Sequence, residues 1–449
     1  MCNLHASKLG EFDVIVIGGG TAGVIAAVQA GRAGAKTLLV EKNGMLGGTM
    51  TVGGVNFPGM FHAWGRQVIA GIGWDLVSRC VAECGGKLPD FSGPAPSWNH
   101  GVHVNLPVYA ALCDEAVVGA GVELLLHTMV AAVADEPDAK RVTFCTKTGL
   151  AEATAIVLID CTGDANAVSL AGYDVNVLPE CQPATLVCKV SGYDPVKLDF
   201  DAIDAAYVEQ VRQGKLLVTD GCWDTTRPSV RRWLSGRGGN CGHVGGGSAH
   251  DSFEKTRLEL RARESVLRMF RFLRSQPGLE NFHIEFIAPE CGVRETVTIV
   301  GNELITVDDY SSGKRWADAV CYSYYPIDLH TVDGTGINGR PLDKGAVPTI
   351  PRGSMLPAGS TNVIVAGRCI SSDRLANSAL RTQSTCMATG QAAGAMATLA
   401  ARTHTAAGKL PMSDIHALLK EHGAIVPQEV KNSRSQEAKK SRSQEGEKL

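Results

Sequence analysis

Short apolar segments alternate with segments rich in small or amphipathic residues along most of the chain, which is typical of an α/β protein. Residues 13–17 are an apolar, β-branched run next to glycines, as in a buried parallel strand. The Ala-rich segment 22–33 predicts a helix that ends at Gly34, and residues 36–40 predict a second strand. Together these segments predict one complete strand–helix–strand unit.

The pattern then becomes less regular but keeps its strands and helices. The expected elements, in chain order, are one helix (67–84) within a Gly- and Pro-rich insertion (44–101), a helix (108–120), a strand (122–126), two antiparallel strands (130–133 and 141–146) and a buried strand (155–160). The antiparallel pair indicates a β-meander attached to the parallel sheet.

The pattern of predicted strands and helices changes in the middle of the chain, and the first pattern returns near residue 341. Strands are expected in the middle part at 185–190, 282–287 and 297–299, and an Arg-rich helix at 252–274. The stretch 235–247 has seven glycines, which predicts a mobile loop. After residue 341, the segment 362–366 predicts another buried strand, and 382–401 predicts a long helix rich in Ala and Gly.

These segments predict an α/β fold with a Rossmann-like nucleotide-binding domain, in which a parallel sheet carries a β-meander. The first part of this domain is residues 11–175, and its return segment is 341–425. Residues 176–340 form an inserted α+β substrate or cap domain. Residues 428–449 are polar, contain Ser-Arg-Ser-Gln-Glu twice, and are expected to be disordered.

Composition and charge narrow the class of protein. The 449 residues carry 43 Lys and Arg against 46 Asp and Glu, a balance that argues against a nucleic-acid-binding protein. No apolar run approaches the roughly 18 residues of a membrane span, and the N-terminus lacks the apolar segment of a secretory signal. The 14 cysteines are scattered without a CxxC pair, which favours reduced thiols in a cytoplasmic protein over a disulfide framework or a metal site.

The glycine motif Gly18-x-Gly20-x-x-Gly23 stands between the first strand and the first helix. In this position Gly18 permits a tight turn, Gly20 lets the backbone approach a pyrophosphate, and Gly23 lets helix and strand pack closely. The helix N-terminus offers free N–H groups to phosphate oxygens. Glu41, at the end of the second strand, can accept hydrogen bonds from ribose hydroxyls, and its charge disfavours the 2′-phosphate of NADP.

A second glycine pair follows that strand in the segment Lys42-Asn43-Gly44-Met45-Leu46-Gly47-Gly48-Thr49. An NAD site has no need of this pair, whereas an extended flavin passes such a loop. The chain here resembles FAD-dependent oxidoreductases with a glutathione-reductase-type FAD domain, a group related to the fumarate reductase and succinate dehydrogenase flavoproteins. The segments that carry the resemblance are VIVIGGGTAGVIAA, LLVEKNGMLGGT, the stretch 159–164, YPIDLH, the stretch 350–357, and VAGRCIS through GQAAGAMA.

The resemblance implies FAD as the cofactor and assigns roles to matching positions. Glu41 would hold the adenosine ribose, Val130 the adenine side, and Gly163 and Asp164 the dinucleotide. A helix start at Gly390 would face the flavin ring and stabilise its reduced, anionic form. The full set of expected FAD-binding residues is Gly18, Gly20, Thr21, Ala22, Gly23, Glu41, Lys42, Gly47, Gly48, Thr49, Val130, Gly163, Asp164, Gly367, Arg368, Gly390, Gln391, Ala392 and Ala393.

Four residues are candidates for catalysis, namely His330, Arg294, Arg381 and Tyr325. A histidine can move a proton near neutral pH, and an arginine can hold a substrate anion against the flavin. Each has a structural alternative: a satisfied core histidine, an ion pair of Arg294 with Glu290 or Glu295, and a salt bridge of Arg381 to the FAD domain. Cys369 and Cys386 are read as core thiols. Arg352 and the stretch 371–374 depart from the pattern of the relatives.

The sequence therefore predicts an FAD-dependent oxidoreductase that moves a hydride between a small organic substrate and flavin N5. A quinone, another redox protein, NAD(P) or oxygen would exchange electrons with the reduced or oxidised flavin. Two alternatives stay open: a flavin-dependent RNA-modification component, for which the Arg-rich helix would be the contact surface, and a non-catalytic flavoprotein subunit. A homo-oligomer is compatible with the sequence.

Overall fold

The computed structural model describes residues 6–92, 100–224, 227–240, 242–245 and 247–428. The sequence predicts disorder for residues 428–449. Of these, residues 429–449 lie outside the described part of the chain. The helices are α1 (Thr21–Arg32), α2 (Ile72–Glu83), α3 (Leu106–Gly119), α4 (Asn166–Leu170), α5 (Phe200–Arg212), α6 (Val218–Gly221), α7 (Arg231–Ser235), α8 (Ser252–Arg274), α9 (Val307–Ser311), α10 (Arg374–Leu380), α11 (Gln383–Thr403) and α12 (Met412–Glu421).

The strands are short except where the main sheet and its meander require length. They are β1 (Ser7–Ile17), β2 (Thr37–Val40), β3 (His62–Ala63), β4 (Arg66–Gln67), β5 (Glu123–Leu125), β6 (Met129–Asp135), β7 (Lys140–Thr146), β8 (Gly149–Asp160), β9 (Val175–Val177), β10 (Cys188–Ser191), β11 (Gly238–Gly239), β12 (His283–Ile287), β13 (Val297–Ile299), β14 (Ala319–Tyr322), β15 (Ile327–His330), β16 (Ile337–Arg340), β17 (Thr349–Pro351) and β18 (Val363–Val365).

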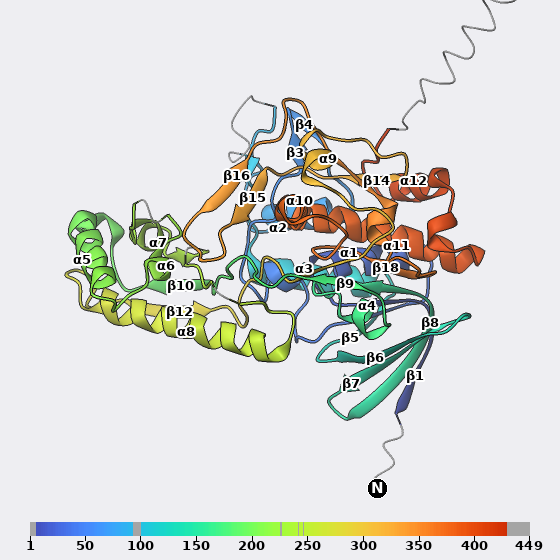
Figure 1. Cartoon of the computed structure of the whole chain (residues 1–449), viewed down its shortest axis with the longest axis horizontal. Helices are drawn as coiled ribbons and strands as arrows, with labels where there is room; N and C mark the ends of the chain where they lie inside the picture. The colour runs from blue at the N-terminus through green and yellow to red at the C-terminus, as the bar shows by residue number, and fades with distance from the viewer. Residues whose placement is uncertain (1–5, 93–99, 225–226, 241, 246, 429–449) are drawn as a thin grey trace, which may run out of the picture.

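The central sheet is the parallel sheet with a β-meander that the sequence predicts (Figure 1). Its order is β5-β2-β1-β8-β7-β6, and β18 also pairs with β8. The pairs β5–β2, β2–β1, β1–β8 and β8–β18 are parallel, whereas β6, β7 and β8 form an antiparallel meander. Strand β8 serves both parts, because its first residues pair with β7 and its last three with β18.

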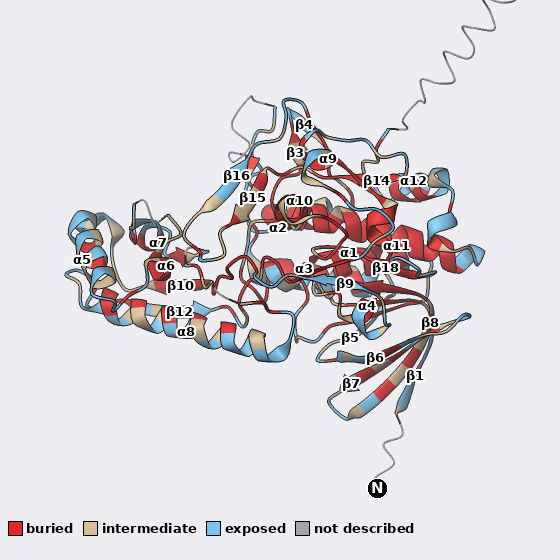
Figure 2. Ribbon diagram, viewed as in Figure 1, coloured by how far each residue is buried: buried red, intermediate tan, exposed pale blue. Residues whose placement is uncertain are grey.

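Apolar strands and small-residue helices explain the core of this sheet. Val14, Ile15 and Val16 of β1 are fully buried, as expected for a strand covered on both faces. Helix α11 is buried along most of its length against α1 (Figure 2). Added Cβ atoms at Gly390 and Gly394 of α11 would lie 2.3 Å from the carbonyl oxygens of Ala22 and Ala26 in α1. Glycine at these positions therefore lets the two helix backbones come into contact.

The inserted unit has hydrophobic clusters of its own and projects from the main body at the left of Figure 1. It contains the sheet β11-β10-β12 and helices α5 to α8. Helix α8 has the predicted bounds, while the strand expected at 185–190 begins at Cys188 and the glycine-rich loop contributes β11. The main core already includes Val297, Ile299 and Ile327, so the chain rejoins it well before residue 341.

Strand β13 shows why the sequence pattern puts the end of the inserted domain at residue 340, although the chain rejoins the main core earlier. Its residues Val297, Thr298 and Ile299 are all β-branched and favour a strand like those of the inserted unit, yet β13 pairs with β9 beside the main sheet. Periodicity reports that a segment is a buried strand but not which sheet it joins. Among the described helices, none is both long enough and apolar enough to cross a bilayer.

Candidate active site

One large cavity of about 1740 Å³ lies between the main sheet and the inserted unit. The carboxyl ends of four parallel strands open into it, through Gly18 after β1, Glu41 after β2, Cys161 after β8 and Gly367 after β18. Ligands of open α/β sheets bind at this edge, because loops and helix N-termini converge there. The cavity is larger than the about 300–1,000 Å³ typical of a site for one ligand, so it has room for two molecules.

The glycine motif forms the floor of the cavity at the start of α1. Gly18 has a φ of +97°, and an added Cβ would lie 2.6 Å from the carbonyl oxygen of Cys161. A Cβ on Gly23 would lie 1.7 Å from the carbonyl oxygen of Gly18. Gly20 is the N-cap of α1 and leaves the helix without a side-chain cap, and a Cβ on it would lie 3.8 Å from the Cα of Gly48. The exposed N–H groups of this helix therefore suit a phosphate.

Glu41 is held at the end of β2 by two backbone donors. The N–H of Gly19 donates to its Oε2 at 2.7 Å, and the N–H of Asn43 donates to its Oε1 at 2.8 Å. Burial raises the pKa of this carboxyl, and the two N–H donors oppose that shift. Each carboxylate oxygen retains a lone pair, so the side chain is fixed and still able to accept a ribose hydroxyl.

The second glycine pair lies against the first. The N–H of Gly47 donates to the carbonyl oxygen of Gly19 at 2.8 Å, and Gly48 approaches so closely that a Cβ on it would lie 2.8 Å from the Cα of Gly20. Gly48 and Thr49 line the cavity, as do Thr21, Ala22, Lys42 and Val130. Gly23 and Gly47 do not border the cavity. Their lack of a side chain lets the backbone segments below the cavity pack closely together.

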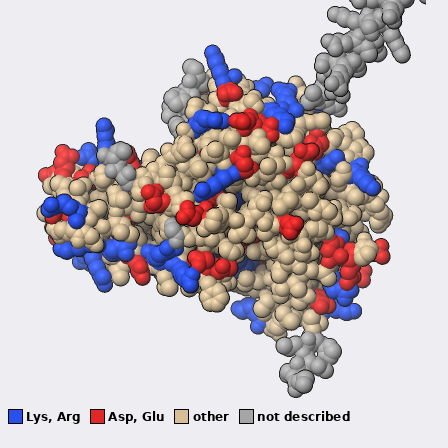
Figure 3. Space-filling view, viewed as in Figure 1, with Lys and Arg blue, Asp and Glu red and all other residues tan. Residues whose placement is uncertain are grey.

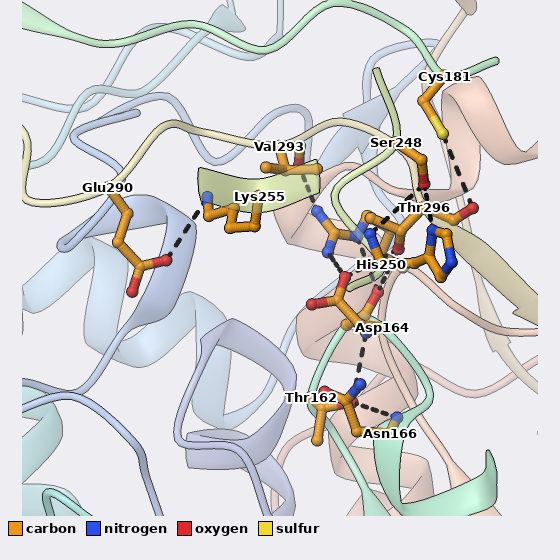
Figure 4. A network of polar contacts seen from close by, with 12 residues as sticks. Thr162, Asp164, Asn166, Cys181, Ser248, His250, Lys255, Glu290, Val293 and Thr296 are labelled. Atoms are coloured by element: carbon orange, nitrogen blue, oxygen red, sulfur yellow. Dashed lines mark hydrogen bonds and ion pairs between the residues drawn. The ribbon is translucent and has the colours of Figure 1, made fainter. Parts of the chain in front are cut away.

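Arg368, which follows β18, bonds to Gly163 and Asp164, which follow β8. Figure 4 shows Asp164 with Thr296 in the surrounding polar network. Its Nε donates to the carbonyl oxygen of Gly163 at 2.9 Å, and its Nη2 lies 2.5 Å from Oδ1 of Asp164. The hydroxyl of Thr296 donates to the same Oδ1 at 2.8 Å. Gly163, Asp164, Gly367 and Arg368 all border the cavity, in line with their expected place along the dinucleotide.

The stretch Gly390-Gln391-Ala392-Ala393 lies elsewhere, and its expected contact with the flavin is corrected here. Gly390 packs against α1, while the amide of Gln391 donates to Gln29 and to the carbonyl oxygen of His422 at 3.1 Å each. Helix α11 starts at Gln383, seven residues earlier, which displaces this stretch about 10 Å along the helix. The α11 residues that border the cavity are Gln383 and Cys386, next to the N-cap residue Thr382.

All four candidate catalytic residues border the same cavity, although they come from distant parts of the sequence. Arg294 precedes β13, Tyr325 and His330 flank or end β15, and Arg381 is the C-cap of α10. We call these four residues, together with Asp328, Gln182 and His243, the polar cluster. The last three were not singled out by the sequence.

Arg294 is buried and uses hydrogen bonds to neutral groups. Its Nη1 donates to the carbonyl oxygen of Pro183 at 2.7 Å and to the hydroxyl of Thr185 at 3.1 Å, and its Nη2 donates to Asn240 at 3.4 Å. Burial, and then the charge of Arg381, lower its pKa to about 9. The alternative of an ion pair with the neighbouring glutamates is wrong, since Glu295 pairs with Arg374, and Glu290 with Lys42 and Lys255.

The carboxylate of Asp328 lies close to both Arg381 and His330 of the polar cluster. Nη2 of Arg381 lies 3.1 Å from its carbonyl oxygen and 3.4 Å from its Oδ2, and Nε2 of His330 lies 3.5 Å from the same Oδ2. Burial raises the pKa of Asp328, but His330 and the two arginines outweigh it and hold the pKa below its usual range. Asp328 and His330 are two positions apart on β15 and therefore point to the same face. That spacing is the signal that could have identified Asp328.

His330 and His243 form an edge-to-face ring pair with centroids 4.8 Å apart. Burial lowers the pKa of His330 to about 4 and that of His243 to about 3, so both are neutral at pH 7. Nδ1 of His243 lies 3.0 Å from the carbonyl oxygen of Gly334. Nδ1 of His330 and Nε2 of His243 are buried and have no hydrogen-bond partner among the described residues. Two ring nitrogens are thus left for a ligand.

Several other residues that the sequence singled out have structural roles. Arg352 donates to the carbonyl oxygen of Leu410 at 2.7 Å, and burial raises the pKa values of the Cys369 and Cys386 thiols. The described cysteines are all free, and no group of three candidate metal ligands occurs within the described ranges.

Several arginines of helix α8 form ion pairs with acidic residues, and the helix has a solvent-exposed face. Arg257 pairs with Glu254, Arg263 lies 3.4 Å from Glu259, and Arg268 lies 2.7 Å from the buried Asp220. Figure 3 likewise shows side chains of both charges interspersed over the inserted unit. These pairs leave this helix with a mixed rather than a basic surface, which does not favour the RNA-contact alternative.

Comparisons with known proteins bear directly on this cavity. The model of the FAD dependent oxidoreductase family matches residues 13–419, which include the glycine motif, Glu41 and every residue of the polar cluster. The chain belongs to this family. The match confirms the resemblance stated from the sequence motifs, and it establishes FAD as the cofactor.

Individual relatives match over short stretches. Dihydrolipoyl dehydrogenase of Trypanosoma brucei brucei is 47% identical over 53 residues, which is 12% of this chain and 11% of that protein. Leghemoglobin reductase of Glycine max is 46% identical over 59 residues, 13% of this chain and 11% of that protein. The chain thus spans about a tenth of the length of these curated relatives.

Matches to solved structures have low sequence identity and low TM-scores. A geranylgeranyl bacteriochlorophyll reductase-like protein of Thermoplasma acidophilum is 13% identical with a TM-score of 0.42, covering 92% of this chain and 84% of that one. The p-nitrophenol 4-monooxygenase PnpA of Pseudomonas putida DLL-E4 is 10% identical with a TM-score of 0.43, covering 95% and 92%.

The fixed carboxylate of Glu41 gives a test of the FAD cradle. We expect Glu41→Ala to raise the dissociation constant for FAD by about 10- to 100-fold, since it removes charge-assisted hydrogen bonds worth about 1.5–3 kcal/mol. Glu41→Gln should lose less, because an amide oxygen can still accept one of these bonds. Fluorescence titration of the apoprotein with FAD measures both. Unchanged affinity in Glu41→Ala would place the ribose elsewhere.

Proposed function

We propose that this protein is an enzyme that moves a hydride between a small polar organic substrate and the N5 atom of bound FAD. The observation that carries the proposal is that the dinucleotide cradle and the polar cluster border one cavity, with room for a second molecule. The cradle residues fit FAD: the Gly18 turn, the uncapped start of α1 and the fixed Glu41 supply the backbone approach, the N–H donors and the ribose acceptor.

FAD, when bound, would supply the redox chemistry by taking up or giving back a hydride at its ring. The residues of the polar cluster would do the rest. Arg294 and Arg381 would bind and orient the substrate, because Arg294 is buried, Arg381 is partly buried, and Asp328 is the carboxylate that lies close to Arg381. Precise orientation matters for hydride transfer, since the donor and acceptor atoms must be held in contact.

His330 is the group that would hold the proton. Nε2 of His330 lies 3.5 Å from Oδ2 of Asp328, which favours the tautomer in which Nε2 carries the hydrogen and Nδ1 carries a lone pair. That buried nitrogen has no partner in the described part of the protein, so it is available to accept a proton from a substrate O–H or N–H. In the reverse direction the same nitrogen returns the proton. His243, in ring contact with His330, helps to exclude water from this position.

Anaerobic reduction of the purified holoprotein tests the proposal. Hydroxy acids, amines and enoates are mixed with the oxidised or the reduced protein, and the visible flavin spectrum is followed. We expect at least one compound to bleach, or to restore, the flavin absorbance with one equivalent per flavin. A substrate deuterated at the reacting carbon should slow the change. If dithionite reduces the flavin but none of these compounds exchanges electrons with it, hydride transfer to a small molecule is wrong.

A further inference from the structure

The polar cluster carries one more positive than negative charge. Arg294 and Arg381 are cationic, Asp328 is ionised, and the two histidines are neutral at pH 7. Burial raises the pKa of Tyr325, which therefore stays neutral. The adjacent charged groups balance each other as the pairs Arg368–Asp164 and Arg374–Glu295. The cluster as a whole therefore lacks one negative charge.

Unused hydrogen-bonding atoms are found in the same cluster. Nε of Arg381 and Nε2 of Gln182 are buried donors with no acceptor among the described residues. Nδ1 of His330 is a buried acceptor with no donor among the described residues. The same holds for Nε2 of His243, whose other ring nitrogen lies next to the carbonyl oxygen of Gly334. A buried, unsatisfied polar atom costs about 1–3 kcal/mol, so these atoms call for a ligand that offers both an acceptor and a donor.

We propose that the polar cluster binds a monocarboxylate that carries a hydroxyl or an unprotonated amino group close to its carboxylate, as in a 2-hydroxy acid or in a 2-amino acid bound in its form of net charge −1. The carboxylate supplies the missing negative charge and accepts from Arg381 and Gln182. The hydroxyl or amino group donates to Nδ1 of His330, with His243 beside it. This assignment rests on the proposed function and adds the substrate class to it.

The resulting reaction is balanced without a further reagent. In the oxidative direction the C–H bond next to the hydroxyl or amine breaks, and its hydride, with both electrons, passes to the flavin. The O–H or N–H proton passes to Nδ1 of His330, and the electron pair of that bond forms the C=O or C=N bond of the product. The substrate is oxidised by two electrons, and the flavin, as the oxidant, is reduced by two.

The charge count also excludes other ligands. A dicarboxylate would convert the excess of one positive charge into an excess of one negative charge in a buried site. An amide or an ester would leave the original positive charge uncompensated. An unpaired buried charge is costly in either case. The site should therefore discriminate by charge as well as by shape.

The test is a spectral titration of the oxidised, anaerobic holoprotein with matched probes. These are 2-hydroxy acids of increasing chain length, the 2-amino acids of the same lengths, malate as the dianion, and the corresponding 2-hydroxy amides. We expect one of the monocarboxylates to perturb the flavin spectrum with a dissociation constant at least about tenfold below those of malate and of its own amide, as expected for loss of one charged hydrogen bond. Equal or tighter binding of malate or an amide overturns the proposal.

A charge variant makes the test sharper. Asp328→Asn raises the net charge of the cluster by one, so the ratio of malate to monocarboxylate affinity should rise by about tenfold or more. Arg381→Met should weaken monocarboxylate binding by a similar factor, and Arg271→Gln, an exposed position on α8, should leave all constants unchanged. An unchanged malate ratio in an Asp328→Asn protein that retains FAD contradicts the charge count.

The outcomes separate this inference from the proposed function. The selectivity of the wild-type protein is measured without any variant, so a variant that fails to fold does not leave the question open. Bleaching by a substrate that lacks a carboxylate would retain hydride transfer and overturn the substrate class. Failure of every compound to exchange electrons would overturn the proposed function itself.

Discussion

Replacing Gly23 with alanine is expected to lower the free energy of unfolding by about 3 kcal/mol or more and to abolish FAD uptake. The reason is steric, because the added Cβ would lie 1.7 Å from the carbonyl oxygen of Gly18 and 3.1 Å from the Cβ of Cys161. The neighbouring atoms are backbone atoms of the turn that approaches the pyrophosphate. Helix α1 and this turn can separate only if the floor of the cavity changes shape.

Chemical denaturation and FAD fluorescence measure the two effects. Gly119→Ala is the matched control, since Gly119 also lies in a helix, is exposed, and has no atom within 4 Å of an added Cβ. That substitution should be neutral or raise stability by about 0.5–1 kcal/mol, because alanine favours a helix more than glycine does. A Gly23→Ala protein with normal stability and a normal flavin spectrum would contradict the packing described for α1.

His330→Gln is expected to lower kcat for the preferred substrate by about 10²–10⁴-fold, the usual range for loss of a general base. KM should change much less, since Arg294 and Arg381 remain to hold the substrate. The glutamine amide can still contact Asp328 but cannot take up the substrate proton. Stopped-flow measurement of flavin reduction gives the rate of this step. Reduction at the wild-type rate would show that His330 is only a packing residue.

The pH dependence gives an independent check on the same residue. In the free protein burial lowers the pKa of His330 to about 4, so kcat/KM for substrate oxidation should fall only as the pH approaches 4. A bound anion next to the ring favours its protonated form and raises this pKa, so the fall in kcat should begin at a higher pH. Both acid limbs should disappear in His330→Gln. An acid limb that persists unchanged in the variant would belong to another group.

The cofactor half of the site was largely predictable from the sequence. The motif from Gly18 to Gly23 and Glu41 lie within a single strand–helix–strand unit, so their relation in space follows from local geometry. Helix α8 was predicted to the residue, because its polar pattern lies within the segment itself. The exception is Gly390: the helix over 382–401 was predicted within a few residues of α11, but Gly390 lies inside this helix and not at its start.

The substrate half depended on contacts between distant segments. The ion pair of Asp328 with Arg381 became evident only from the structure, which places β15 beside the end of α10. Gln182 and His243 join the polar cluster from loops that are far away in the sequence. The partner of Glu295 likewise proved to be Arg374, whereas sequence proximity had favoured Arg294.

The sequence by itself thus determined the fold class and the family, because these follow from the order of the elements and from motifs that are each local in the chain. It also determined the glycine turn with Glu41, because the geometry of these residues is fixed within one strand–helix–strand unit. The tertiary structure alone decided which charges meet in the cavity and which of their polar atoms are left without a partner. Charge balance and desolvation depend on the distances between segments and on burial. Neither quantity is encoded in local periodicity, and both arise only when the inserted unit closes over the carboxyl edge of the sheet.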